Sequence, residues 1–365
     1  MESIKIDVFA TKTLQVFQAS ESIKRNKYAF MRRDTVINEI VNNINLGCNG
    51  MLLYGRRRIG KTTVLYNLDI FLSTDTYNII YISMQNARYN TSLENNFIPN
   101  LITKLEIFVS DFPNKTKNTL EYFYDVLSLC NKNLIYNNKY IIICIDEYEG
   151  INENMINGTF NVNLLTTIRE SIKNHSNIFW LFSGSNRLSE LKTIQWTSYF
   201  ISFKTVEILP FTFIETKYLL TQPFKYADSE NLKNTKINVW DKGSIEKIYE
   251  ETNGWPYFVQ AIAHAAIEIL KSDQARSKVD LYILENAFRK VIQSSYNSFE
   301  RLLKNECEIK GEWEYILEFT NSDLQLKPSN PLIRESLKRR LIIKEVDNMW
   351  KINMPLMERW LKMYY

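Results

Sequence analysis

The sequence predicts an α/β fold, in which a parallel sheet flanked by helices is followed by a helical lid and a C-terminal winged helix. Three observations lead to this prediction. As far as Leu209, short apolar runs that end in polar residues alternate with amphipathic stretches, which is typical of parallel sheets covered on both faces. After Pro210 the pattern becomes helical only. Near the C-terminus, two β-rich runs flank Asp347-Asn348, and this indicates a hairpin.

The first expected strand, residues 51–54, leads into the most specific motif of the chain. The motif has the form G-x-x-x-x-G-K-[ST] and reads Gly55-Arg56-Arg57-Arg58-Ile59-Gly60-Lys61-Thr62-Thr63. A helix is expected directly after it, over 62–71. In this strand–loop–helix context the motif is a phosphate-binding loop (P-loop) whose backbone N–H groups cradle nucleotide phosphates. Lys61 would reach the β- and γ-phosphates, and the Thr62 hydroxyl would bind Mg²⁺. An ordinary turn with a solvated lysine is disfavoured because all three elements agree.

A second motif, which is acidic, follows a buried strand about 80 residues after the P-loop. The apolar run 139–145 ends in Asp146-Glu147-Tyr148-Glu149, at the sheet edge where α/β proteins bind ligands. Asp146 would hold Mg²⁺ through its water shell. Glu147 would orient or deprotonate the attacking water, with Glu149 as the next candidate for that role. The alternative is that these acids only begin a turn.

The remaining strands of the sheet are expected at 78–83, 177–182 and 205–209, with helices near 97–108, 119–130 and 163–173. After the strand 177–182, Ser185 and Asn186 are candidates to sense the γ-phosphate or hold the water. The alternative is a turn that uses their backbone tolerance. His175 is expected to be a solvated loop residue, His264 a packed core residue and Cys144 a small apolar filler.

The C-terminal half predicts helices at 213–220, 244–251, 256–270 and 280–303, and winged-helix elements at 313–319, 332–340, 341–346, 349–353 and 355–361. Asn253-Gly254 is a helix-end signal, and Pro256 suits the first turn of the next helix. The expected domains are an N-terminal segment 1–27, a nucleotide-binding core 28–209, a lid 210–304 and a winged helix 305–365. The helix 332–340 carries basic residues that would contact DNA phosphates in a DNA-binding winged helix. A solvated basic face is the favoured alternative. These residues are Arg334, Lys338, Arg339 and Arg340.

Composition narrows the class of protein. With 365 residues, 45% of them hydrophobic, the chain is expected to be globular with two or three domains. Its apolar runs are too short for a membrane span, and its first residues do not resemble a signal peptide. The four cysteines are far apart in the sequence and only two histidines occur, so we do not expect a zinc site. The same cysteine pattern fits a reducing compartment, so we expect a cytoplasmic location. A net charge of +4 does not by itself indicate nucleic acid.

Taken together, the motifs resemble those of the archaeal-type ATPases in the STAND branch of AAA+-related P-loop NTPases, which belong to the ASCE division. The resemblance rests on the arginine-rich P-loop and the Asp146-Glu147-Tyr148-Glu149 motif. It also rests on Ser183-Gly184-Ser185 after a strand and on Asn253-Gly254-Trp255-Pro256. It extends from about residue 27 to the C-terminus.

The resemblance implies further site residues. Arg33 lies in Phe30-Met31-Arg32-Arg33-Asp34, where the family has F-x-G-R-E near the adenine; Arg32 replaces the family's glycine. Pro256 would pack near the adenine or ribose from the lid. The arginines at 56–58 would line the entrance to the phosphate-binding site. Their alternative role is to pair with nearby acidic side chains.

The resemblance also implies a function: an ATP-gated switch, closed over ADP and opened by a trigger, in prokaryotic defence or signalling. ATP or ADP and Mg²⁺ would be its cofactors. Family members usually attach a sensor repeat array or an effector domain. The expected segment 1–27 is too short for either, so a protein partner is expected. A nucleotide-dependent oligomer is compatible with this reading. The alternatives are a DNA-associated ATPase of the replication-initiator or transposon-regulator type and a scaffold without useful turnover, against which Glu147 argues.

Overall fold

The protein is described by a computed structural model. It covers residues 31–86, 92–109, 119–191, 193–226, 236–321, 330–347 and 349–365, together with 17 and 234. The chain divides into two compact units. The first, here called the α/β unit, contains residues 32–56 and 60–209. The second, the C-terminal unit, contains residues 57–59 and 210–365 with the N-terminal segment. Phe30 and Asn348, which the sequence placed in the adenine segment and the hairpin turn, lie outside the described residues.

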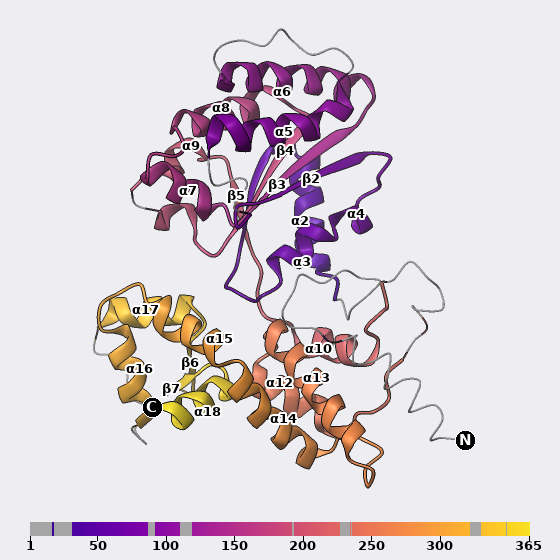
Figure 1. Ribbon diagram of the computed structural model, residues 1–365, viewed down its shortest axis with the longest axis vertical. Helices are drawn as coiled ribbons and strands as arrows, with labels where there is room; N and C mark the ends of the chain where they lie inside the picture. Colours follow the sequence, from indigo (N-terminus) through magenta and orange to yellow (C-terminus); the bar gives the residue numbers. More distant parts are fainter. Residues whose placement is uncertain are drawn as a thin grey trace. The chain divides into compact units, whose positions relative to one another are not determined.

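A five-stranded parallel sheet forms the centre of the α/β unit (Figure 1). The strand order is β2-β3-β4-β1-β5, and every neighbouring pair is parallel. The strands are β1 (Gly50–Tyr54), β2 (Tyr77–Ser83), β3 (Tyr140–Asp146), β4 (Ile178–Gly184) and β5 (Lys204–Glu207). All five predicted strands are confirmed. The register sets Tyr54 opposite Gly184 and Asp146 opposite Ser183, so the loops that follow β1, β3 and β4 begin at one edge of the sheet.

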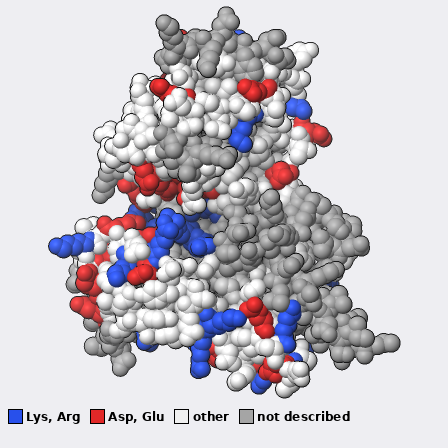
Figure 2. All heavy atoms as spheres, viewed as in Figure 1, with Lys and Arg blue, Asp and Glu red and all other residues white. Residues whose placement is uncertain are grey.

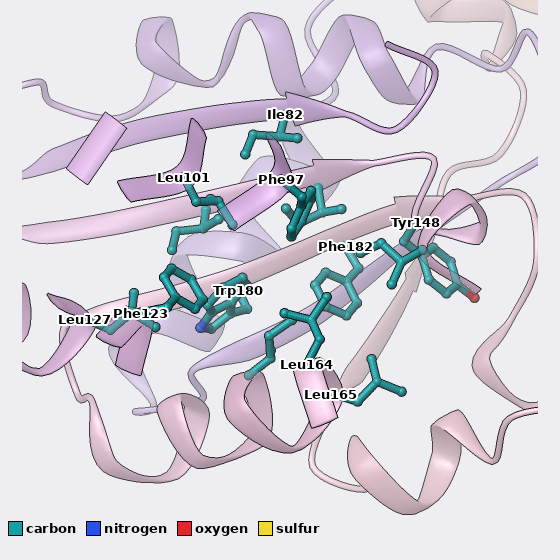
Figure 3. Close-up of a cluster of buried hydrophobic side chains, with 14 of the residues drawn as sticks. Ile82, Phe97, Leu101, Phe123, Leu127, Tyr148, Leu164, Leu165, Trp180 and Phe182 are labelled. Atoms are coloured by element: carbon teal, nitrogen blue, oxygen red, sulfur yellow. The ribbon is translucent and has the colours of Figure 1, made fainter. Parts of the chain in front are cut away.

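Helices pack against the sheet and bury its apolar side chains. They are α2 (Asp34–Asn45), α3 (Lys61–Tyr66), α4 (Leu68–Phe71), α5 (Ile98–Leu105), α6 (Thr119–Tyr136), α7 (Glu149–Ile156), α8 (Asn163–Asn174) and α9 (Trp196–Tyr199). A π-helical turn, Leu93–Phe97, precedes α5, and short 3-10 turns lie at Glu106–Phe108 and Leu188–Glu190. Figure 3 shows side chains from these helices gathered around Trp180 and Phe182 of β4. Cys144 of β3 is also fully buried, as predicted.

Two local predictions for this unit are wrong. The helix expected over 62–71 is interrupted at Asn67, whose side-chain amide donates to the Thr63 carbonyl at 2.6 Å. Such a side-chain bond competes with the helical backbone. His175 is buried rather than solvated, because it packs between α6 and α8. Its ring nitrogens lie 2.9 and 3.0 Å from the hydroxyls of Ser171 and Ser128, and burial lowers its pKa to about 4.

The described residues of the C-terminal unit form helices, one hairpin and an isolated parallel bridge between Trp240 and Val279. Its elements are α10 (Phe213–Thr221), α12 (Ser244–Thr252), α13 (Pro256–Ser272), α14 (Leu281–Ser294), α15 (Tyr296–Glu300), a π-helical turn (Arg301–Asn305), α16 (Glu312–Asn321), α17 (Pro331–Arg339), β6 (Ile343–Val346), β7 (Met349–Ile352) and α18 (Pro355–Tyr364). Helices α16 and α17 are followed by the antiparallel hairpin β6–β7, which is the order of elements expected for the predicted winged helix. In the described residues, no helix is both long and apolar enough to cross a membrane.

The sequence missed two details of this unit. The helix expected over 280–303 is divided, because α14 ends at Ser294 and the backbone of the next residue, Ser295, leaves the helical conformation (φ −100°, ψ 17°). His264 is not a packed core residue. Its side chain is 38% exposed and lies 3.5 Å from the Glu268 carboxylate, one turn further along α13.

The side chains of α18 join the two predicted C-terminal domains. The Arg359 guanidinium donates to Glu251 of α12 at 2.6 Å and to Glu285 of α14 at 2.7 Å. Trp360 of α18 stacks on Phe299 of α15. These contacts connect the lid helices with the winged helix inside one compact unit. The separate domain boundaries at 210–304 and 305–365 stay a prediction.

The turn between α12 and α13 depends on glycine. Asn253 and Gly254 both have positive φ, 47° and 69°, as expected at a helix end. The Gly254 carbonyl accepts a hydrogen bond from the Phe211 N–H at 2.8 Å. A Cβ on Gly254 would come within 1.9 Å of the Phe211 carbonyl oxygen, so this backbone approach excludes any side chain.

We therefore expect Gly254→Ala to reduce the free energy of unfolding by at least about 2 kcal/mol, as positive φ and a backbone clash combine. Urea denaturation measures this loss. Gly243→Ala is the matched control, because Gly243 also has positive φ (83°) but a Cβ there would meet nothing within 4 Å. Equal losses in the two variants would show that the approach of Phe211 does not matter.

Candidate nucleotide-binding site

The P-loop begins where the buried strand β1 ends. Gly60, the residue directly before α3, has a φ of 98°, a conformation that glycine adopts without strain. Lys61 is largely buried, and its ammonium donates to the carbonyls of Gly55 and Arg56 at 2.6 and 3.1 Å. It also lies 3.3 Å from the Ser185 hydroxyl. The lysine charge is therefore held inside the loop that is predicted to receive phosphates.

Thr62 and Asp146 lie together, as the sequence predicted for a magnesium site. The Thr62 hydroxyl donates to Asp146 Oδ2 at 2.6 Å, and Asp146 is only 1% exposed. Among the described residues, no group of three or more His, Cys, Asp or Glu side chains could hold a metal ion by itself. A hydroxyl and one carboxylate fit Mg²⁺, which usually completes its coordination with water and substrate phosphates. These donors therefore fit the ion that the motif implies.

Tyr81 is a member of this site that the sequence analysis missed. Its hydroxyl donates to Asp146 Oδ2 at 2.9 Å, the same oxygen that Thr62 contacts. Burial and the nearby Asp146 charge raise the pKa of Tyr81, so the phenol stays a donor. The centre of its ring lies 4.3 Å from the centre of the Tyr66 ring of α3. The polar end of an otherwise apolar strand, Tyr81-Ile82-Ser83, was the available signal.

We expect Tyr81→Phe to raise the Mg²⁺ concentration needed for half-maximal ATP binding by about 3- to 10-fold. The reason is that one hydrogen bond worth about 1 kcal/mol no longer orients the Asp146 carboxylate. Titration of Mg²⁺ at fixed ATP measures the effect. Tyr77→Phe, in the same strand, is the control. An unchanged Mg²⁺ requirement in Tyr81→Phe would exclude this orienting role.

Glu147 lies beside Asp146 in an unusual backbone conformation. Its φ is 54°, which is uncommon for a residue with a side chain and often occurs at functional sites. Its N–H donates to Asp146 Oδ1 at 3.1 Å. Its side chain is half-buried at the sheet edge where the P-loop begins. The assignment of Glu147 as the base stays a prediction.

Asn186 and Glu149 are brought together across the ends of β3 and β4. Glu149 Oε1 accepts hydrogen bonds from the N–H groups of Ser185 and Asn186. The Asn186 carbonyl accepts a hydrogen bond from the Tyr148 hydroxyl. The residue before Asn186, Ser185, is the one whose hydroxyl lies close to the Lys61 ammonium. Its predicted catalytic role stays a prediction.

The structure separates the remaining predicted residues into two groups. Arg33 is buried at the start of α2 in the α/β unit, and Arg32 beside it lies over the ring of Phe71, 4.8 Å from its centroid. Thr63 lies in the first turn of α3. The tip of the P-loop, residues 57–59, is grouped instead with the C-terminal unit.

In the C-terminal unit, both arginines of the tip have partners. Arg57 forms an ion pair with Glu306 at 2.8 Å, and Arg58 lies 4.6 Å from the centre of the Tyr257 ring. Ile59 is fully buried. Pro256 opens α13, as the sequence predicted. Contacts of these four residues with a nucleotide stay a prediction.

The basic residues of α17 do not form a free cationic face. Arg340, which directly follows α17, is 2% exposed and forms a buried ion pair with Glu312 at 2.5 Å. It therefore belongs neither to a solvated basic face, which was the favoured expectation, nor to a surface that could contact DNA phosphates. Arg339 pairs with Glu308, Arg334 lies 3.5 Å from Glu335, and Lys338 lies over Trp350. Both basic and acidic side chains are visible on the face shown in Figure 2.

Comparison with known proteins agrees with this geometry. Residues 49–217 match the family model described as "AAA domain". A Walker-type ATPase of Pyrococcus abyssi has a similar structure, with a TM-score of 0.57 and 16% identity over 91% of this chain and 96% of that one. The ORC2 protein of Aeropyrum pernix, solved as ADPNP-ADP complexes, has a TM-score of 0.52 and 13% identity over 95% and 98%. No curated protein matches the sequence.

Proposed function

We propose that this chain is an archaeal-type, AAA+-related P-loop ATPase that works as an ATP-binding and slowly hydrolysing molecular switch of the STAND type. The match of residues 49–217 to the AAA domain model and the similarity of its fold to a Walker-type ATPase support this proposal. The observation that carries this proposal is the convergence of Lys61, Thr62 and Asp146 at one edge of the sheet, with Glu147 beside them. On this proposal the switch works in the cytoplasm in prokaryotic defence or signalling, and a protein partner supplies the trigger or the effector.

The site residues have complementary chemical roles in this proposal. Lys61 would turn its charge from the loop carbonyls to the β- and γ-phosphates, and the loop N–H groups would hold the phosphate oxygens. Thr62 and Asp146 would hold Mg²⁺, which offsets charge on the phosphates. Glu147 would orient a water and accept its proton. Lys61 and Thr62 begin the helix that follows β1, whereas Asp146 ends β3 and Glu147 follows it.

The C-terminal unit supports the switch part of the proposal. The turn at Asn253-Gly254 is bonded to the winged helix, because Asn253 donates to the Asn353 side chain at 3.0 Å. Arg359 ties the same winged helix to α12 and α14. A change at the turn would therefore be passed to the winged helix. Nucleotide can drive such a change only through contacts that differ between the two states.

Hydrogen exchange tests the switch. We expect ADP to increase protection over residues 252–270, and Pro256→Ala to weaken ADP binding modestly and reduce that added protection. Pro331→Ala is the matched control, because Pro331 also opens a helix, α17, in the same unit. Equal protection with and without ADP, also unaffected by Pro256→Ala, would refute the switch while leaving ATP binding intact.

The DNA-associated alternative has less support. Arg340, one of the four basic residues on which it relied, is buried in an ion pair, and Arg339 is paired with Glu308. DNA binding through phosphate contacts should be tight at low salt and fall steeply as salt rises. Fluorescence anisotropy with duplex DNA at several salt concentrations measures this. Tight, salt-sensitive binding would favour the DNA-associated ATPase, and weak binding would favour the switch.

A further inference from the structure

Three hydrogen bonds join the residues that follow β3 to those that follow β4. Glu149 Oε1 accepts from the N–H of Ser185 at 2.5 Å and from the N–H of Asn186 at 2.8 Å. The Tyr148 hydroxyl donates to the Asn186 carbonyl at 2.9 Å. Two consecutive residues after β4 are thus held through their backbones by two consecutive residues after β3. A segment held in this way has little freedom to change its path.

Gly184 makes this close approach sterically possible. A Cβ on Gly184 would lie 2.6 Å from Glu149 Oε1 and 2.5 Å from carbon atoms of the Tyr148 ring. Both distances are shorter than real Cβ contacts, so a residue with a side chain would displace the carboxylate or the ring. The glycine of the Ser183-Gly184-Ser185 motif therefore admits the two side chains that hold the segment.

The Tyr148 ring is fixed independently of its hydroxyl. It is fully buried and stacks on Phe182, with ring centres 5.9 Å apart, while its edge meets Trp196 at 5.2 Å. Figure 3 shows Tyr148 and Phe182 side by side at the end of the core. Because packing sets the direction of the phenol, its hydroxyl is pre-oriented toward the Asn186 carbonyl.

The held segment faces the P-loop lysine. Ser185 Oγ lies 3.3 Å from Lys61 Nζ. Burial raises the pKa of the Glu149 carboxyl, although backbone hydrogen bonds and the charge of Lys61 act in the opposite direction. The contacts run from Glu149 through the backbone of Ser185 to its hydroxyl and then to Lys61. Any shift of Glu149 would therefore move the Ser185 hydroxyl relative to the lysine.

We propose that Glu149 is a positioning residue, which, together with Tyr148, holds Ser185 against Lys61 through the backbone of residues 185–186. Glu149 is then not an alternative general base, because its Oε1 is used to hold two N–H groups. The essential property of Glu149 is an acceptor oxygen at this point, not its ability to take a proton. This inference builds on the ATPase site proposed above and assigns it a further residue.

The test compares Glu149→Gln, which keeps an acceptor oxygen, with Glu149→Ala, which removes it. Two quantities are measured: hydrogen exchange over residues 183–188 in the nucleotide-free protein, and the single-turnover rate of ATP hydrolysis. For Glu149→Ala we expect clearly faster exchange at Ser185 and Asn186 and about a 10- to 100-fold slower turnover. For Glu149→Gln we expect near-normal protection and recovery of most of the rate.

Two further variants keep the result interpretable. Glu153→Ala, at an exposed position of the same helix α7, should change neither quantity. Tyr148→Phe removes one of the three hydrogen bonds and should increase exchange at Asn186 to a smaller extent. It replaces Glu149→Ala as the test if that variant does not fold.

The proposal is overturned if Glu149→Gln is as inactive as Glu149→Ala while protection is retained, because the proton or charge of Glu149 would then matter. It is also overturned if removal of the acceptor, or of the Tyr148 hydroxyl, leaves exchange over residues 183–188 unchanged. The exchange measurement uses no nucleotide. Its outcome is therefore separate from whether the protein hydrolyses ATP, and failure of the positioning role can be told apart from failure of the ATPase proposal.

Discussion

Replacing Lys61 with alanine should weaken Mg-ATP binding by at least about 100-fold. A charge-assisted hydrogen bond contributes about 1.5–3 kcal/mol, and Lys61 would provide more than one to the β- and γ-phosphates; a factor of ten corresponds to about 1.4 kcal/mol. In the structure the ammonium is already enclosed by the P-loop, at 2.6 and 3.1 Å from two loop carbonyls. Isothermal calorimetry with Mg-ATP measures the loss.

The matched control is Lys173→Ala, which removes an exposed lysine of α8 that pairs only with its neighbour Glu170 among the contacts described. It should bind ATP normally. Since Lys61 also holds two carbonyls of its own loop, thermal melting of Lys61→Ala shows whether the variant remains folded. Unchanged ATP affinity in a folded Lys61→Ala would refute the assignment of this loop as the phosphate site.

Glu147→Gln should retain ATP affinity and lose turnover by about 10²- to 10⁴-fold, the range that a general base contributes. Glu147 follows Asp146 directly, and its positive φ of 54° directs the chain into a sharp turn at the sheet edge. Glutamine keeps the size of the side chain and removes its capacity to take a proton. Single-turnover hydrolysis and ATP binding are measured on the same preparation.

The comparison with Glu149 makes this result specific. In Glu147→Gln, exchange over residues 183–188 should stay normal, because Glu147 contacts Asp146 and does not hold the segment after β4. Normal hydrolysis by Glu147→Gln would assign the base to another group. If Glu149→Gln then lost turnover with the segment still protected, Glu149 would be that group.

Sequence patterns predicted the elements of this protein well, because those patterns are local. An apolar run with β-branched residues indicates a buried strand wherever it pairs, and all five strands were found in this way. The P-loop and the acids at the end of β3 were recognisable because each motif lies within one short stretch of consecutive residues. Asn253-Gly254 and Pro256 likewise marked the end of α12 and the start of α13.

Errors arose where the surroundings of a side chain decided its state. His175 has polar neighbours in sequence, yet it is buried, since α6 and α8 pack around it and supply two serine hydroxyls. Arg340 continues a basic run, yet its guanidinium is enclosed with Glu312, 28 residues earlier. Neither partner can be identified from spacing, because both depend on how helices pack.

The sequence by itself determined that this chain carries a phosphate-binding loop and a carboxylate pair on a parallel α/β sheet. It could do so because each motif consists of consecutive residues. Only the tertiary structure decided how those motifs are joined. The strand register brings Tyr81 to Asp146 across 65 positions and Ser185 to Glu149 across 36. Hydrogen bonds form between residues that are neighbours in space, and a sheet edge creates such neighbours from segments that the sequence keeps far apart.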